Sequence, residues 1–221
     1  MKTIRERELE GHVITAPVGI DAIRECLDPF ATLKAQARLA RRRMPEYLEL
    51  YRPQHRFAAY WQIAHMLDEP YRACLLRNVW GYDREPSVNE DAWRHELQMC
   101  ARNSQAFMSA EDRVTFESLP LSITIYRAPR VDELVPRGFS WTFDRDWADM
   151  FSFLVAEGKN DDRYVFQAEC EPHKAAAFIL DQDANAELVI FPENIGQWER
   201  IPARPWERYE YDGREYLRRQ A

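Results

Sequence analysis

Three short stretches of the sequence combine residue types that are suited to chemistry. Arg127 ends the alternating stretch LSITIYR, Ser140 and Thr142 flank Trp141 ahead of a helical pattern, and Glu187 opens the stretch ELVIFP. A guanidinium donates paired hydrogen bonds to phosphate oxygens, and a fixed carboxylate stabilises a positive charge that develops beside it. Hydroxyl groups can orient such a carboxylate. The set therefore suits the binding of an anion and the cleavage of a bond that builds positive charge.

The same residues also fit purely structural roles. By strand alternation, Arg127 and Glu187 both fall on the apolar face of their stretches, where charges are rare unless they lie at a strand end or are paired. Each lies at a strand terminus, so both can point into a cleft, lie at the solvent edge, or form a structural ion pair with each other. For Ser140 and Thr142 the ordinary role is strand-end and helix-capping hydrogen bonding.

The first half of the chain has helical periodicity. Ser109 is the expected N-cap of a helix that ends before Pro120. Apolar residues recur at helical spacing in four earlier stretches, which lie at 31–43, 57–67, 71–80 and 87–103.

The second half changes to the period-two pattern of strands. Strands are predicted within 121–127, 163–170, 175–180 and 187–192. Asp144 is a plausible N-cap of an intervening amphipathic helix. Its apolar stripe is made of Trp147, Phe151, Leu154 and Val155. We expect an α+β protein with a helical region at 1–118 and a β-rich domain with a C-terminal arm at 119–221, as separate parts or as one compact unit.

Composition limits the classes of partner. The chain of 221 residues carries a net charge of −7, which argues against a broad nucleic-acid surface. It has no apolar run that could span a membrane and no signal-peptide pattern at its start, so we expect a cytoplasmic protein without a membrane partner. The four cysteines are scattered, as in reduced proteins. Cys170 and His173 are only half of a metal site, so we expect no metal.

The order of these motifs resembles the ADP-ribosyltransferase fold of the arginine–serine–glutamate type. The family pattern is an aromatic–arginine pair that ends a strand, then Ser-x-Ser/Thr, then a Glu-x-Glu or Gln-x-Glu pair that opens a later strand. Here Tyr126-Arg127, Ser140-Trp141-Thr142 and Asn185-Ala186-Glu187 are similar to it. The stretch RGFSWTFDRDWADMF looks like bacterial and phage members. The resemblance covers roughly residues 109 to 193 and implies a split β-sheet domain.

The resemblance implies an NAD-dependent mono-ADP-ribosyltransferase, with NAD as co-substrate and an acceptor for which protein is favoured over nucleic acid. Glu187 would stabilise the oxocarbenium-like transition state and Ser140 would hold Glu187 in position. Thr142 would support the strand or the nicotinamide side, and Trp141 would pack on the opposite face. The resemblance also counts Ser140, Trp141 and Thr142 among the residues that bind NAD. Arg127 would bind the phosphates or ribose of NAD, and Ala128 would offer its backbone to the nicotinamide amide. The biological class implied is a phage or bacterial effector.

Two positions depart from the family pattern. Ala128 and Pro129 follow the arginine where the family usually has glycine, and Pro129 has no N–H to offer. Asn185, the third expected catalytic residue beside Glu187 and Ser140, stands where the family has glutamate or glutamine, so arginine is less suited as the acceptor. These departures favour one alternative, a catalytically silent partner-binding module. An NAD glycohydrolase is a further, narrower alternative.

Overall fold

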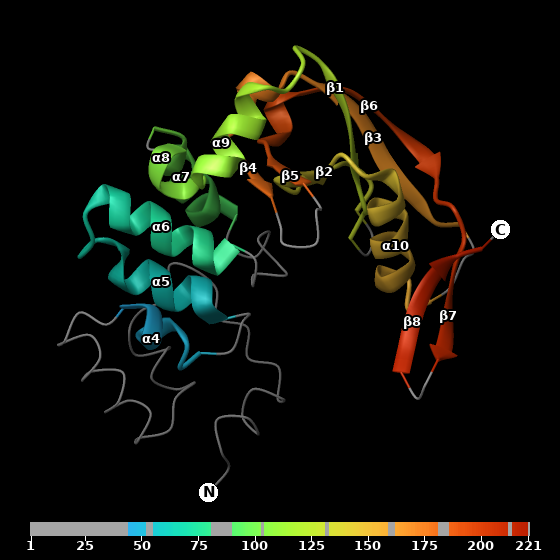
Figure 1. Ribbon diagram of the computed structural model, residues 1–221, viewed down its shortest axis with the longest axis horizontal. Coiled ribbons are helices and arrows are strands. Elements are labelled where there is room, and N and C mark those ends of the chain that lie inside the picture. Colours follow the sequence, from blue (N-terminus) through green and yellow to red (C-terminus); the bar gives the residue numbers. More distant parts are fainter. Residues whose placement is uncertain are drawn as a thin grey trace, which may run out of the picture. The chain divides into compact units, whose positions relative to one another are not determined.

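A computed structural model describes residues 44–51, 55–80, 90–102, 104–130, 133–158, 162–180, 186–211 and 214–220 of the chain. The chain divides into two compact units, a helical unit, Met1–Phe107, and a sheet unit, Met108–Ala221 (Figure 1). This division lies before the boundary expected after residue 118. The predicted helix at 31–43 lies outside the described residues.

The described part of the helical unit consists of short helices around an aromatic core. Phe57 and Trp93 stack with their ring centroids 3.8 Å apart. The buried carboxylate of Glu96 accepts hydrogen bonds from the Tyr60 hydroxyl and the Arg72 guanidinium. The helices are α4 (Met44–Leu48), α5 (Arg56–Ala64), α6 (Glu69–Trp80), α7 (Glu90–Arg102) and α8 (Ser104–Phe107), and α5 to α7 lie where helical periodicity predicted them.

The sheet unit is built on an antiparallel sheet of six strands in the order β4-β5-β2-β1-β3-β6. A separate hairpin of two strands follows the sheet in the chain. Helices followed by an antiparallel sheet agree with the expected α+β class. The strands are β1 (Ile123–Arg127), β2 (Ser140–Thr142), β3 (Tyr164–Cys170), β4 (Ala177–Leu180), β5 (Ala186–Val189), β6 (Ile195–Pro202), β7 (Trp206–Tyr211) and β8 (Arg214–Arg219). The expected C-terminal arm therefore consists of β6, which extends the sheet, and the β7–β8 hairpin.

Helix α9 (Ala110–Glu117) explains why the units divide before residue 108. Ser109 caps the helix as predicted, and together with Asp112 it forms a capping box. The same Asp112 carboxylate accepts a hydrogen bond of 2.8 Å from the backbone N–H of Leu180 in β4. The rings of Phe116 and Phe178 stack with centroids 6.2 Å apart. The helix thus belongs to the sheet unit.

Helix α10 (Arg145–Val155) follows β2 directly and lies along the sheet (Figure 1). Asp144 caps it, because its carboxylate accepts from the backbone N–H groups of Asp146 and Trp147. The buried side differs from the apolar stripe in the sequence. Phe151, Leu154 and Val155 are exposed, whereas the residues that face the sheet unit's interior are Ala148, Asp149, Ser152 and Phe153.

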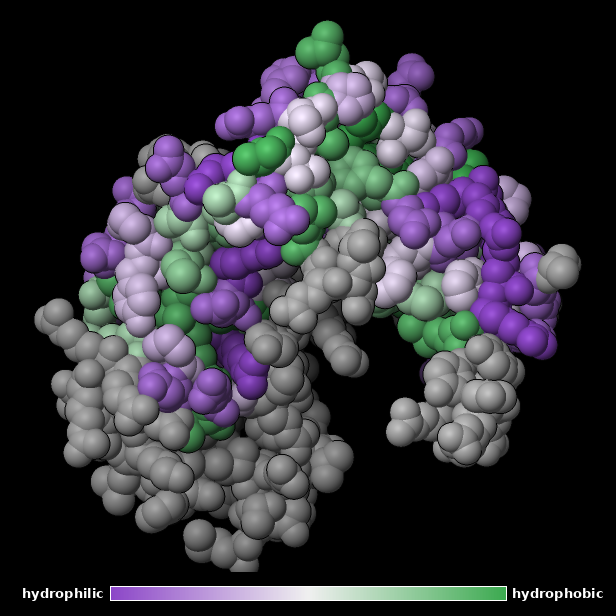
Figure 2. Space-filling view, viewed as in Figure 1, coloured by the Kyte–Doolittle hydropathy of each residue, from purple (hydrophilic) through white to green (hydrophobic). Residues whose placement is uncertain are grey.

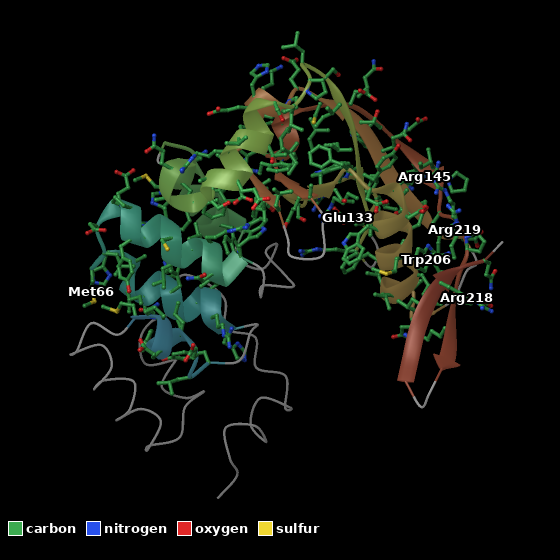
Figure 3. The ribbon with its side chains drawn as sticks, viewed as in Figure 1. Met66, Glu133, Arg145, Trp206, Arg218 and Arg219 are labelled. Carbon is green, nitrogen blue, oxygen red and sulfur yellow. The ribbon has the colours of Figure 1, made fainter. Side chains whose placement is uncertain are left out.

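Polar contacts explain this orientation of α10. The Ser152 hydroxyl donates to the backbone carbonyl of Tyr164 at 3.0 Å. Asp149 lies 3.5 Å from Arg204, and Asp146 forms ion pairs with Arg204 and Arg219. Arg145, Arg218 and Arg219 lie near one another in Figure 3, in a region whose surface in Figure 2 is strongly hydrophilic. Charge pairing with the C-terminal segments therefore sets which face of α10 is buried.

The end of α10 contains a residue in a strained backbone conformation. The Gly158 N–H donates to the Phe153 carbonyl and the Glu157 N–H to the Leu154 carbonyl, which is the Schellman pattern of helix ends. Glu157 has φ of 53°, in the left-handed region. Since glycine adopts this conformation without a Cβ clash, Glu157→Gly should stabilise the sheet unit by about 1 kcal/mol. Urea unfolding would measure the gain, and Ala156→Gly, at φ of −79°, should instead destabilise it.

Among the described residues, no helix combines the length and the apolar character needed to cross a membrane.

Candidate functional site

The sheet order brings the three sequence motifs together. Strands β5, β2 and β1 are consecutive neighbours, and they carry Glu187, the Ser-Trp-Thr motif and Arg127 respectively. These residues are separated by up to sixty positions in the chain, so only the strand pairing makes them neighbours. The antiparallel crossings place the end of β1 beside β2 and the start of β5 beside the end of β2.

The register decides which hydroxyl faces Glu187. Thr142 is the direct partner of Glu187 across β2 and β5, and it is also the partner of Tyr126 across β1. Ser140 pairs instead with Val189. Residues directly opposite one another in an antiparallel pair point to the same face. Thr142 is therefore the nearer hydroxyl in the register, and Ser140 lies two positions along the same face.

Thr142 also shapes the turn into α10. It is 8% exposed, and its hydroxyl oxygen accepts a hydrogen bond of 3.0 Å from the backbone N–H of Asp144. Trp141 leaves the opposite face of β2, where it is 1% exposed and pairs with the fully buried Leu188. Its position agrees with the packing role expected from the sequence.

Arg127 lies one position beyond Tyr126, so its side chain leaves the face opposite to that of Thr142 and Glu187. It is 8% exposed. Its Nη1 donates to the backbone carbonyl of Ser140 at 3.0 Å. Gly138 leaves room for the guanidinium, because an added methyl group there would lie 2.0 Å from Nη2. Arg127 thus ties the end of β1 to the segment that leads into β2.

Glu133 is the carboxylate that pairs with Arg127, and it was not among the residues predicted from the sequence. One of its oxygens lies 3.4 Å from Nη2 of Arg127. The backbone N–H groups of Arg130 and Arg137 donate to the two oxygens at 2.8 Å and 2.7 Å. Glu133, labelled in Figure 3, lies in the segment between β1 and β2. The signal in the sequence that could have indicated Glu133 is its position between Arg130 and Arg137, but such spacing is common in charged loops.

The pKa values of the two partners follow from this geometry. Burial opposes ionisation of Glu133, but the Arg127 charge and the two backbone donors outweigh it, so its pKa lies below the ordinary value. Burial lowers the pKa of Arg127, and the charge of Glu133 partly offsets this. Arg130 also lowers the pKa of Arg127, whereas the more distant Glu187 raises it. Arg127 therefore lies within electrostatic reach of both carboxylates.

One donor of Arg127 is left over. Within the described part of the chain, its Nε is buried and has no hydrogen-bond partner. Since Nη2 is also at the long limit of a hydrogen bond, only Nη1 is well satisfied. A buried guanidinium in this condition can donate a hydrogen bond to a further anionic oxygen. Ala128 beside it is half-buried, and Asn185 lies outside the described residues.

The Glu133 carboxylate should make folding depend on pH. Because its pKa in the folded protein lies below the ordinary 4.5, its stabilising contribution is present above about pH 4.5 and is lost as the pH falls through the lower folded value. Glu133→Gln should cost about 1–2 kcal/mol at pH 7, since glutamine still accepts from the backbone. Urea unfolding from pH 7 to pH 3 should show this difference shrink. A difference that stayed constant would contradict the assignment.

The described residues hold no group of three or more potential metal ligands. A groove of about 420 Å³ between the end of α10 and the hairpin is lined by Phe153, Trp206 and Arg208 among others, and none of the residues discussed above as site residues lines it. Comparison of the chain with protein-family models, curated proteins and solved structures finds no match.

Proposed function

We propose that the protein is an NAD-dependent ADP-ribosyltransferase whose site is formed where β1, β2 and β5 adjoin. The observation that carries the proposal is the adjacency of the three motif-bearing strands, with Thr142 directly opposite Glu187. This adjacency supports the proposal because the three motifs must lie side by side to act on one ligand.

The roles of the residues follow from their chemistry. Glu187 lies at the start of β5, where its carboxylate can stabilise positive charge on the ribose as the bond to nicotinamide breaks. Thr142 is placed to orient that carboxylate, and Ser140 lies further along the same face. In the reaction, nicotinamide leaves C1′ of the ribose with the bonding electrons. A nucleophile of the acceptor then forms the new bond to C1′ and loses its proton.

Arg127 is the residue suited to the NAD diphosphate. The charge of Glu187 raises the pKa of Arg127, although the two side chains leave opposite faces of the sheet. Its buried Nε lacks an acceptor among the described residues, which fits a ligand that supplies oxygen atoms.

A direct test follows free nicotinamide over time after the purified full-length protein is mixed with NAD. Release at a rate above the spontaneous one supports the proposal. Labelled NAD then separates two outcomes, since a transferase labels an acceptor and a glycohydrolase releases ADP-ribose into solution. No release, together with no shift of the melting temperature by NAD, would contradict the proposal.

The second candidate is a catalytically silent partner-binding module. The observation that favours it is the engagement of Arg127, whose guanidinium already contacts Glu133 and the Ser140 carbonyl. An arginine used only to hold the segment between β1 and β2 would bind no phosphate. The NAD-induced shift in melting temperature separates the two candidates.

A further inference from the structure

Three arginines contact the Glu133 carboxylate, which lies in the segment between β1 and β2. Arg127, Arg130 and Arg137 all contact Glu133, the first through its guanidinium and the other two through backbone N–H groups. The Arg130 charge also acts on Arg127. Two cations near one another, with backbone donors aimed at the same point, form an arrangement that binds anions.

We propose that Glu133 is an internal competitor for this anion site, and that the diphosphate of NAD binds Arg127 by displacing the Glu133 carboxylate. This inference rests on the proposed function. It makes Glu133 a residue that sets the affinity for NAD, in addition to any structural role.

The contacts of Glu133 explain why it can be displaced. The Glu133 side chain is 7% exposed and the Arg127 side chain is 10% exposed, so the pair is largely shielded from solvent. Yet the contact between them is long, at 3.4 Å, and the Nε of Arg127 has no acceptor in the described part of the chain. A diphosphate offers more oxygen atoms and more negative charge than one carboxylate. It can therefore satisfy the guanidinium better than Glu133 does.

The Ser140 carbonyl would hold Arg127 during this exchange. Its hydrogen bond from Nη1, at 3.0 Å, does not involve Glu133. Gly138 leaves the space that the guanidinium occupies. Removal of the carboxylate alone should therefore leave the guanidinium in position and open to an anion.

The test measures the dissociation constant of inorganic pyrophosphate by calorimetry at fixed ionic strength, because salt screens such contacts. The proteins are the wild-type full chain, Glu133→Gln, and Glu199→Gln as a matched control. Glu199 is an exposed carboxylate on β6 of the same sheet. Glu133→Gln should bind pyrophosphate about tenfold more tightly than the wild type. Glu199→Gln should bind as the wild type does, and Arg127→Met in the Glu133→Gln background should abolish the gain.

Equal or weaker binding by a folded Glu133→Gln variant would overturn the inference. Glu133→Asp covers the case in which that variant fails to fold, because it keeps the charge but shortens the arm. It should also bind pyrophosphate more tightly than the wild type, and unchanged affinity would again overturn the inference.

The same titrations with NAD, together with the assay of nicotinamide release, separate this inference from the proposed function. If Glu133→Gln binds pyrophosphate more tightly and the wild type releases no nicotinamide, the anion site is supported and the transferase activity is contradicted. If the wild type releases nicotinamide and Glu133→Gln changes the affinity for neither ligand, the enzymatic activity is supported and the competition by Glu133 is contradicted.

Discussion

Replacement of Glu187 by glutamine is expected to lower the rate of nicotinamide release from NAD by roughly a thousandfold with the fold intact. Glutamine has nearly the shape of glutamate but no negative charge, so it cannot stabilise the positive charge that develops on the ribose. Glu187 lies in β5 opposite Thr142, where it is only partly buried, so the loss of its charge should cost little stability. The measurement compares the initial rates of release by the two proteins at saturating NAD.

Glu199→Gln is the matched control for this experiment. Gln167 pairs with both Tyr126 and Glu199, so Glu199 projects from the same face of the same sheet as Glu187. It should release nicotinamide at the wild-type rate. If Glu187→Gln retained more than about a tenth of the wild-type rate, Glu187 would not be the stabilising carboxylate.

Replacement of Gly138 by alanine is expected to destabilise the sheet unit by about 3 kcal/mol. The new methyl group would lie 2.0 Å from the guanidinium of Arg127. Many arginine side chains would move aside at little cost, but this one is 8% exposed and is held by Glu133 and by the Ser140 carbonyl. Its displacement would break both contacts. Urea unfolding at pH 7 would measure the loss.

A double-mutant cycle identifies the cause of that loss. If the methyl group acts by displacing the guanidinium, Gly138→Ala should cost much less in an Arg127→Ala background, with a coupling of about 2 kcal/mol. Additive effects would show that the alanine acts through the backbone of the segment instead.

Local features of the fold were predictable from the sequence because they depend on residues close together in the chain. Ser109 and Asp144 cap their helices through hydrogen bonds to N–H groups two or three positions away. The predicted strands at 121–127, 163–170, 175–180 and 187–192 overlap β1, β3, β4 and β5, since alternation is also a local pattern. The strands β6 to β8 were interpreted only as an arm, because their sequence is aromatic and charged, and the residues of β6 are mostly exposed.

The buried face of α10 was not predictable from its own residues. Hydropathy alone groups Trp147, Phe151, Leu154 and Val155, whereas the protein buries Asp149 and Ser152. The partners that decide this, Tyr164 and Arg204, come from later segments of the chain. Ser152 is hydrogen-bonded by its distant partner and Asp149 is charge-paired with Arg204, and such partners allow a polar residue to take an interior position.

The candidate site divides in the same way. The sequence by itself determined which residue types are present, that Arg127 ends a strand, and that Trp141 alternates with the two hydroxyls around it. Only the tertiary structure decided that Thr142, rather than Ser140, lies opposite Glu187, and that Glu133 pairs with Arg127. The physical reason is that strand register and the path of a connecting segment depend on contacts between distant parts of the chain. A shift of one residue would turn every side chain of a strand to the other face.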